Sequence, residues 1–319
     1  MAALFNRTNF NRISRIPPAY FVFAVLLVVL WIARPHMLNI NIMGIFIRQV
    51  VPLGILVLGQ MLVIRVNSID LSGAGVLLLI NFYISSSMFP GASLPFFVAI
   101  SLATGLAVGL FNGYMVGKRR VSAVIVTLAV NIVLVGIVQF LASGKPPGDV
   151  PSIFSDIYNT KLWMVPTPVL FWVALALIMS LFLSRFVYGR YVSSVGANPV
   201  AAQFSGVPVE RTVIVAHTIA GLMTALASLV QTASIAVGSV RVGHELPILA
   251  VAATILGGVV FGRGEGGVWG PFFGVLSFAL LFVVMTTFGI GESGKLIAQG
   301  LIILLAAIFY GLRTAKSRT

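Results

Sequence analysis

The chain has 319 residues, of which 59% are hydrophobic and 8% are charged. Soluble domains carry roughly 25% charged residues, so this composition excludes a soluble enzyme and favours a polytopic membrane protein. The net charge of +13 does not indicate a nucleic-acid partner, because the basic residues lie in short gaps between long apolar runs. The absence of cysteine excludes disulfides, thiolate metal sites and cysteine nucleophiles.

Apolar runs of about 20 residues are long enough to cross a bilayer as helices. The first run follows three arginines and ends in Arg34-Pro35-His36 without a small-residue cleavage site, so we interpret it as an uncleaved span. Ten spans are expected at 16–33, 43–64, 71–89, 93–116, 122–142, 167–188, 212–233, 247–261, 267–288 and 295–312. The sequence therefore predicts an all-α, polytopic membrane protein in which residues 1–319 form a single transmembrane domain.

Basic residues indicate how the chain is oriented, because cytoplasmic loops hold the excess of lysine and arginine. With the N-terminus inside, fourteen of the 20 basic residues fall in inner segments and five in outer segments, with Arg48 inside the second span. We therefore expect both termini to be cytoplasmic.

The stretch Gly289–Leu296 reads GIGESGKL and resembles a phosphate-binding loop. Such a loop needs Ser or Thr after the lysine, and Leu296 has no hydroxyl to hold Mg²⁺. No strand is expected before it, and the predicted orientation places it outside, away from ATP. We interpret it as a chance match, so the chain itself is not expected to be an ATPase.

A weak sequence similarity between the two halves of the chain suggests an internal two-fold repeat. In the first half, Ile55-Leu56 is followed by Gly73–Val76. In the second half, Ile248-Leu249 is followed by Gly266–Trp269, and each pair of corresponding positions is 193 residues apart. Duplicated halves are common in transporters, and chance similarity between apolar helices is the alternative.

The inner loop at 189–211 contains the signals of a short helix. Asn198 is a typical N-cap and Pro199 suits the first turn. Gly206 is a left-handed stop, and Pro208 prevents continuation of the helix. We predict a cytoplasmic helix at about 199–205 in which a small face at Ala201 and Ala202 admits a partner and Phe204 anchors it. The alternative is an ordinary loop with one helical turn.

Four stretches together resemble the permeases of ribose-type ABC importers. They are the GRYVSSVGANPVAAQFSG run of the inner loop, Ile69–Ser72, Gly109–Leu128 and Ile255–Gly266. The resemblance runs from about residue 50 to 312. Val66-Asn67-Ser68 and Glu265 depart from the family pattern, which puts the identity of the substrate in doubt rather than the fold.

The resemblance implies a permease subunit in a bacterial inner membrane, with ABC ATPase subunits, an extracytoplasmic solute-binding protein and a second permease subunit as partners. The short helix would then be the coupling helix that sits on the ATPase. The residues implied in coupling are Gly196, Asn198, Pro199, Ala202, Phe204, Ser205 and Gly206.

Polar residues inside apolar spans are candidates for a translocation pathway, although amides can equally bridge helices. The pathway candidates are Gln60, Asp70, Ser72, Asn81, Asn112, Asn131 and His217; Arg48, Gln139 and Gln231 are further polar residues in the spans. Asp70 and Ser72 either cap the third span with Arg65 as ion-pair partner, or belong to a non-helical break that lines the pathway.

The expected function is import of a monosaccharide or similar small polar solute with energy from ATP hydrolysed by partner subunits. A nucleoside permease of the same family and an ion-coupled secondary transporter are the alternatives. An intramembrane enzyme would need a nucleophile–base pair or a metal site in the spans, and no such spacing appears. We therefore predict no catalytic residue, metal or cofactor.

Overall fold

The computed structural model of the chain describes residues 17–86, 88–144, 147–291, 293–302 and 304. Most of these residues are helical, and their one sheet is the antiparallel hairpin of β1 (Lys161–Leu162) and β2 (Val165–Pro166). The all-α prediction is thereby confirmed.

Twelve α-helices and one short 3₁₀-helix make up the named helices of the described residues. They are α2 (Pro18–Ala33), η2 (Pro35–Leu38), α3 (Ile40–Arg65), α4 (Gly73–Ser85), α5 (Leu94–Gly117), α6 (Ala123–Ala142), α7 (Ser152–Asn159), α8 (Thr167–Arg185), α9 (Val187–Ala197), α10 (Pro199–Phe204), α11 (Val209–Ile235), α12 (Leu246–Leu256) and α13 (Trp269–Thr287). A further helical stretch begins at Ser293.

Within the described residues, six helices are long and apolar enough to cross a membrane, namely α3, α5, α6, α8, α11 and α13. The other apolar helices are shorter, with 16 residues in α2, 13 in α4 and 11 in α12. At about 1.5 Å per residue, α4 and α12 reach roughly 20 Å and 16 Å, less than the hydrocarbon core of about 30 Å. The predicted spans 71–89 and 247–261 are therefore wrong as continuous spanning helices, and half of 295–312 lies outside the described residues.

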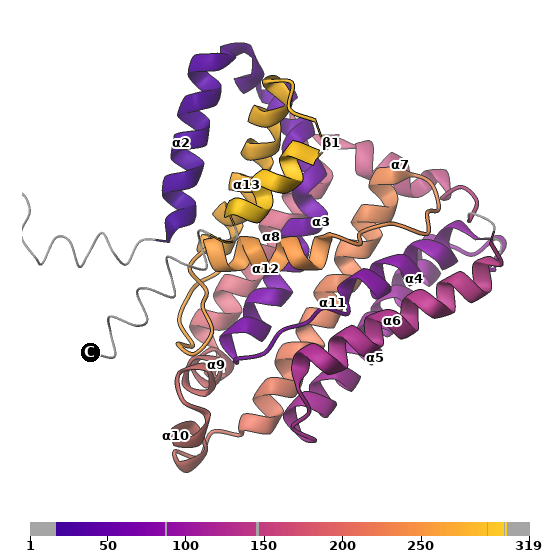
Figure 1. The fold of residues 1–319 in the computed structure, drawn as a ribbon. Coiled ribbons are helices and arrows are strands. Elements are labelled where there is room, and N and C mark those ends of the chain that lie inside the picture. Colours follow the sequence, from indigo (N-terminus) through magenta and orange to yellow (C-terminus); the bar gives the residue numbers. More distant parts are fainter. Residues whose placement is uncertain (1–16, 87, 145–146, 292, 303, 305–319) are drawn as a thin grey trace, which may run out of the picture.

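Two long helices in the centre are each followed by a non-helical segment and a short helix. Residues 66–72 join the 26-residue α3 to α4, and residues 236–245 join the 27-residue α11 to α12. The two short helices start beside each other, since a Cβ on Gly73 would lie 3.3 Å from Pro247 Cγ. Figure 1 shows α4 and α12 running away from each other from this region beside α11.

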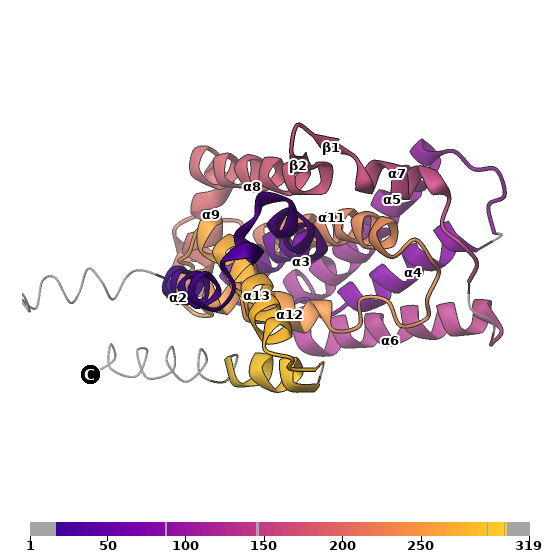
Figure 2. The ribbon, with the colours of Figure 1, turned by 90° about the horizontal axis from the view of Figure 1, so that it is seen from above.

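The core is built around α3 and α11. From Val50 to Arg65 every residue of α3 is buried, which explains the near-continuous apolar run of its sequence. Seen from above, α8 and α6 lie on opposite sides of these central helices (Figure 2). The outward face of α6 exposes Ile132 and Phe140, as expected for a helix that faces lipid.

Close packing of α5 on α11 depends on four glycines at intervals of four residues: Gly105, Gly109, Gly113 and Gly117. A Cβ on Gly113 would lie 2.8 Å from both Cα and O of Ile214, so only glycine fits there. Small residues spaced by four let helix backbones approach closely in membranes. The GxxxG spacing was visible in the sequence, but it was not interpreted as a packing signal.

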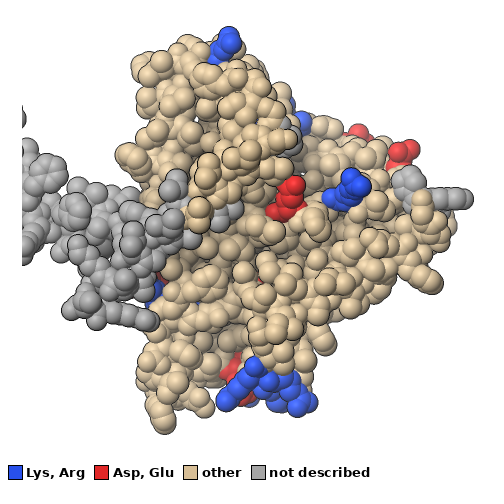
Figure 3. Space-filling model, in the orientation of Figure 1, with Lys and Arg blue, Asp and Glu red and all other residues tan. Residues whose placement is uncertain are grey.

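The two ends of the molecule differ in structure and charge. Figure 1 places α9, α10 and the end of α5 at the bottom and α7, the hairpin and the α2–α3 connection at the top. Lys118, Arg119 and Arg120 follow α5, and Figure 3 shows a basic cluster at that bottom end. At the top, Arg48 donates to Asn159 Oδ1 over 2.9 Å and lies 4.7 Å from the Tyr158 ring centroid, which binds α3 to α7.

The suggested repeat does not align elements of the same kind. Ile55 lies inside the 26-residue α3, whereas Ile248 lies near the start of the 11-residue α12. The order long helix, non-helical segment, short helix recurs instead between α3–α4 and α11–α12.

The phosphate-loop match lies in a turn. Helix α13 precedes it, Gly289 has φ 72°, and a helix follows from Ser293. Glu292 lies outside the described residues. A phosphate-binding loop follows a strand, so the position of a helix before Gly289 supports the chance-match interpretation.

Candidate functional site

Helix α10 forms as its sequence predicts. The Asn198 side chain accepts a hydrogen bond from the Ala201 amide over 3.0 Å, Pro199 occupies the first turn, and Gly206 ends the helix with φ 79°. Ser205 Oγ donates to the Ala201 carbonyl over 2.9 Å. A short helix of this kind keeps its shape because its ends are satisfied by its own residues.

The exposed face of α10 is not the one predicted. Ala202 is only 5% exposed and packs against the chain itself, so it is unavailable to a partner. Phe204 is 89% exposed and Val200 is 62% exposed. The predicted anchor Phe204 is therefore exposed within the described part of the chain, whereas the expected small face is half internal, because Ala202 is buried.

Arg65 and Asn67 join the end of α3 to α9 and to the segment after α12. Arg65 Nη2 donates to Ser193 Oγ over 2.7 Å and its Nε to the Gly264 carbonyl over 3.3 Å. Asn67 donates to the Gly196 carbonyl over 2.9 Å and accepts from the Gly262 amide. We call these contacts the clamp. Gly196, predicted to act in coupling, lies inside the clamp rather than on an exposed face.

Helix α9 is also held to α11. The Tyr188 hydroxyl donates to the Thr212 carbonyl over 3.0 Å. Burial raises the pKa of Tyr188, although Arg65 opposes the shift, so the phenol remains a neutral donor near pH 7. Helix α9 is therefore hydrogen-bonded to both α3 and α11. Sequence reasoning missed Asn67 and Tyr188; polar residues at helix ends were the available signal.

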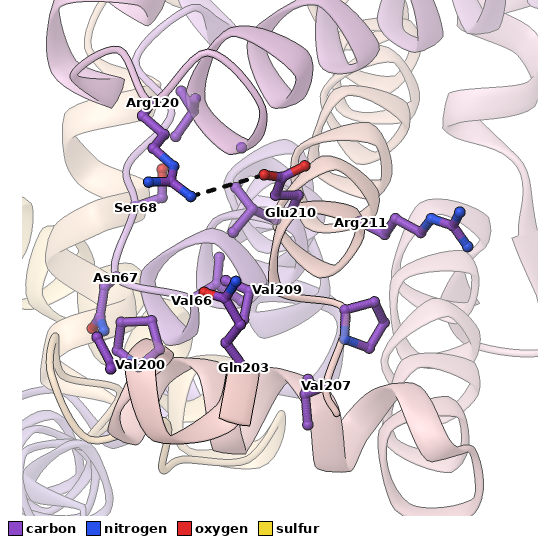
Figure 4. Close-up of a pocket in the computed structure, with 15 residues that line it drawn as sticks. Val66, Asn67, Ser68, Arg120, Val200, Gln203, Val207, Val209, Glu210 and Arg211 are labelled. Atoms are coloured by element: carbon purple, nitrogen blue, oxygen red, sulfur yellow. Dashed lines mark ion pairs between the residues drawn. The ribbon is translucent and has the colours of Figure 1, made fainter. Parts of the chain in front are cut away.

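A cavity of about 500 Å³ lies between α10 and the facing ends of α5 and α11. Figure 4 shows Gln203 and Val200 from α10 below it and Asn67 and Ser68 from the non-helical segment at one side. An ion pair between Arg120 and Glu210, 4.0 Å apart, crosses its upper edge. The cavity leaves α10 attached to the rest of the chain through α9 and the packing of Ala202.

Five polar residues, four of them predicted as pathway candidates, gather in one buried network beside this cavity. Ser68 Oγ lies 2.8 Å from His217 Nε2, and His217 Nδ1 lies 3.9 Å from Asp70 Oδ2. Asp70 Oδ1 accepts from the amide and the hydroxyl of Ser72, over 2.9 and 2.6 Å. Asn112 donates to Ser72 Oγ over 2.9 Å. The network joins the 66–72 segment to α5 and α11; four of its members were pathway candidates, and Ser68 was not.

The capping interpretation of Asp70 and Ser72 is wrong. Ser72 makes no side-chain capping bond to α4, and the expected partner Arg65 is bonded to Ser193 and Gly264 instead. The counterpart of Asp70 is His217, which comes from the interior of α11 and is fully buried. The sequence could not show this pairing because 147 residues separate the two side chains.

The remaining pathway candidates mostly bridge elements. Asn131 Oδ1 accepts from the Gly75 amide over 2.7 Å and so joins α6 to the first turn of α4. Asn81 donates to Thr232 Oγ1 and the Val237 carbonyl and accepts from the Ser239 amide. Gln60 is buried, with its Nε2 unpaired among the described residues. For Asn81 and Asn131 the bridging alternative describes the geometry better than a free pathway lining.

Comparison with known proteins identifies the family to which the chain belongs. Residues 42–307 match the family described as branched-chain amino acid transport system / permease component. The ribose import permease protein RbsC of Escherichia coli K12 is 28% identical over 291 residues, which cover 89% of this chain and 90% of that protein. The L-arabinose transport system permease protein AraH of the same strain is 29% identical over 303 residues, covering 93% and 91%. No solved structure matches the chain.

A third relative is the probable ABC transporter permease protein y4mJ of Sinorhizobium fredii, 29% identical over 269 residues that cover 84% of this chain and 80% of that protein. The family match at 42–307 covers all but the first two residues of α3, the helices from α4 to α13 and the buried network. The resemblance to ribose-type permeases is thereby confirmed, and the chain belongs to the family of transport-system permease components that its motifs predict.

Proposed function

We propose that this chain is the membrane-spanning subunit of an ATP-driven importer for a neutral monosaccharide or a similar small polar solute. The relatives named for ribose and L-arabinose import support the sugar class. The observation that carries the importer mechanism is α10, a capped helix with an 89% exposed Phe204. The preceding helix α9 is connected through the clamp to the 66–72 segment, and the clamp also reaches the segment after α12. A rigid exposed helix connected in this way suits transmission of force from another subunit.

In the proposed arrangement both termini are cytoplasmic, and the whole chain forms one transmembrane domain. The bottom end of Figure 1, with α9, α10 and the Lys118–Arg120 cluster, then faces the cytoplasm of a bacterial inner membrane, as the excess of basic residues favours. Ten crossings result if α4 and α12 each cross together with the non-helical segment beside them. Such broken helices are tolerated at membrane depth where protein buries their backbone.

Coupling to ABC ATPase subunits would use the outer face of α10. Phe204 and Val200 would make the contact, while Asn198, Pro199, Ser205 and Gly206 would maintain the shape of α10. Ala202 and Gly196 would act indirectly, by seating α10 and α9 on the chain. Closure of the ATPases around ATP would then move α9, the clamp and the two broken segments together. ATP hydrolysis belongs to those partners, and GIGESGKL takes no part in it.

An extracytoplasmic binding protein would deliver the solute to the opposite end, and a second permease subunit, identical or related, would complete the pathway. The test is reconstitution of this chain with an ABC ATPase and an extracytoplasmic sugar-binding protein from the same organism. We expect ATP-dependent uptake of radiolabelled neutral sugars that requires all components. Uptake by the chain alone with an ion gradient, or transport of nucleosides in place of sugars, would contradict the proposal.

A matched pair of variants tests the role of α10. Phe204→Ala is expected to lower binding-protein-stimulated ATP hydrolysis at least tenfold, because it removes the apolar contact to the ATPase. Phe288→Ala is the control, since Phe288 is 60% exposed at the opposite end of the molecule. Equal stimulation in the two variants would rule out the proposed coupling face.

A further inference from the structure

A second cavity, of about 600 Å³, lies where α4 and α12 begin. Its walls come from α4, α6, α11, α12 and the connection between α11 and α12, with Ala74, Leu78, Val135 and Leu249 among the apolar lining. Ligand sites in proteins have volumes of roughly 300–1,000 Å³. Ser68 lines the first cavity and Ala74 lines the second. The buried residues Asp70 and Ser72 lie between these two positions in the sequence.

Five polar side chains line this cavity: Gln139, Gln231, Arg241, His244 and Glu245. None of the five has a side-chain hydrogen bond or ion pair within the described part of the chain. Gln231 is half-buried and the other four are exposed. The asparagines of the spans differ, because Asn81, Asn112 and Asn131 are bonded to neighbouring elements. Figure 3 shows an acidic and a basic group close together near the middle of the face drawn there.

The starts of the two short helices add further donors. The first amides of a helix have no partner inside it, and neither the Ser72 nor the Glu245 side chain caps its helix. Broken helices that meet in this way form the solute sites of several transporter folds. Here the converging starts coincide with a cavity that carries unbonded polar side chains.

The chemistry of the lining indicates the class of ligand. The amides of Gln139 and Gln231 donate and accept, Arg241 donates, and Glu245 accepts. The opposing charges balance, so the lining favours neither an anion nor a cation. Apolar residues form the other wall. This combination suits a ring with hydroxyl groups at its edge and C–H groups on its face.

We propose that this cavity is the solute-binding station of the permease and that it takes a neutral polyhydroxylated solute, with Gln231 and Gln139 as its central hydrogen-bonding residues. This inference rests on the proposed function and assigns that function a place in the chain. Gln231 lies on α11, which also carries His217 of the buried network. A solute in the cavity would therefore contact the C-terminal part of α11, whose N-terminal part is bonded to α9.

The absence of cysteine allows a direct test. Gln231→Cys and Gln139→Cys each provide a single thiol for a charged methanethiosulfonate reagent in the reconstituted complex without binding protein. Lys161→Cys on the exposed β1 is the control. First, uptake by the wild-type complex of a panel of radiolabelled neutral pentoses and hexoses identifies a transported sugar. That sugar, at millimolar concentration, is then expected to slow labelling at positions 231 and 139 at least fivefold and at 161 not at all.

The outcomes separate the two proposals. If the wild-type complex transports none of the sugars, the proposed function fails and the assigned ligand class fails with it. If it transports one, but positions 231 and 139 are unreactive, unprotected or protected no more than 161, the site alone is wrong. As a second measure, Gln231→Leu is expected to lower uptake at least tenfold, and Gln231→Asn to restore part of it. Uptake by Gln231→Leu equal to that of the wild type would also overturn the site.

Discussion

Arg65 at the end of α3 donates to Ser193 of α9 over 2.7 Å, across 128 positions of sequence. The Arg65 side chain is almost fully buried, and its second contact is the Gly264 carbonyl beyond α12. The Arg65 side chain therefore joins α9, the helix before α10, to the end of α3 and to the segment after α12.

Removing the Ser193 hydroxyl should weaken this contact without removing the charge. Ser193→Ala is expected to lower the free energy of unfolding by roughly 1.5–3 kcal/mol, the usual contribution of a hydrogen bond to a charged group. It should also lower the ratio of stimulated to basal ATP hydrolysis in the assembled transporter. Ser184→Ala is the control, because Ser184 is exposed and bonds only within its own helix. The role of the clamp would be disproved by a ratio that changes equally in both variants.

The His217–Asp70 pair should be the most sensitive point of the buried network. His217→Leu leaves the Asp70 carboxylate buried without its counterpart, and loss of one member of a buried pair costs about 3–5 kcal/mol. Asp70→Asn removes the charge and keeps an acceptor for Ser72. The double variant is therefore expected to lose less stability than the sum of the two single losses. Thermal unfolding in detergent measures the cycle, and strict additivity would show that the pair does not interact.

Substitution of a packing glycine should separate α5 from α11. In Gly113→Ala the new methyl would meet the Ile214 backbone, and overpacking of this kind costs roughly 1–3 kcal/mol. Gly136→Ala is the matched control, since nothing lies within 4 Å of a Cβ at that position of α6. We expect a lower unfolding temperature for Gly113→Ala only. A similar loss at Gly136 would mean that helix packing is not the reason.

The N-cap of α10 can be tested without changing its exposed face. Asn198→Ala removes the bond to the Ala201 amide, and loss of such a cap typically costs about 1 kcal/mol. Amide exchange in residues 200–204 should become faster, and ATPase stimulation should fall. Asn198→Ser retains a capping oxygen and should behave like the wild type. Unchanged exchange in Asn198→Ala would show that the clamp and Ala202 alone maintain α10.

Local signals allowed much of this structure to be predicted. Asn198, Pro199 and Gly206 lie within a few residues of one another, so capping and turn preferences predict α10 with an error of one residue at its end. The long apolar runs likewise predict α3, α5, α6, α8, α11 and α13, because burial in lipid depends on composition over about 20 residues. The same reasoning failed at 71–89 and 247–261, since an apolar run does not reveal where its backbone leaves the helix.

The sequence by itself determined that the chain is a helical membrane protein of a recognisable permease family with a capped helix near residue 200. The tertiary structure alone decided that His217 faces Asp70, that Arg65 holds α9, and that Ala202 points inward. It also decided which amides bridge helices and which, like Gln231, line a cavity. The physical reason is distance along the chain. The Arg65–Ser193 contact spans 128 positions and the Asn112–Ser72 bridge spans 40, so their geometry depends on how whole helices pack rather than on any local preference.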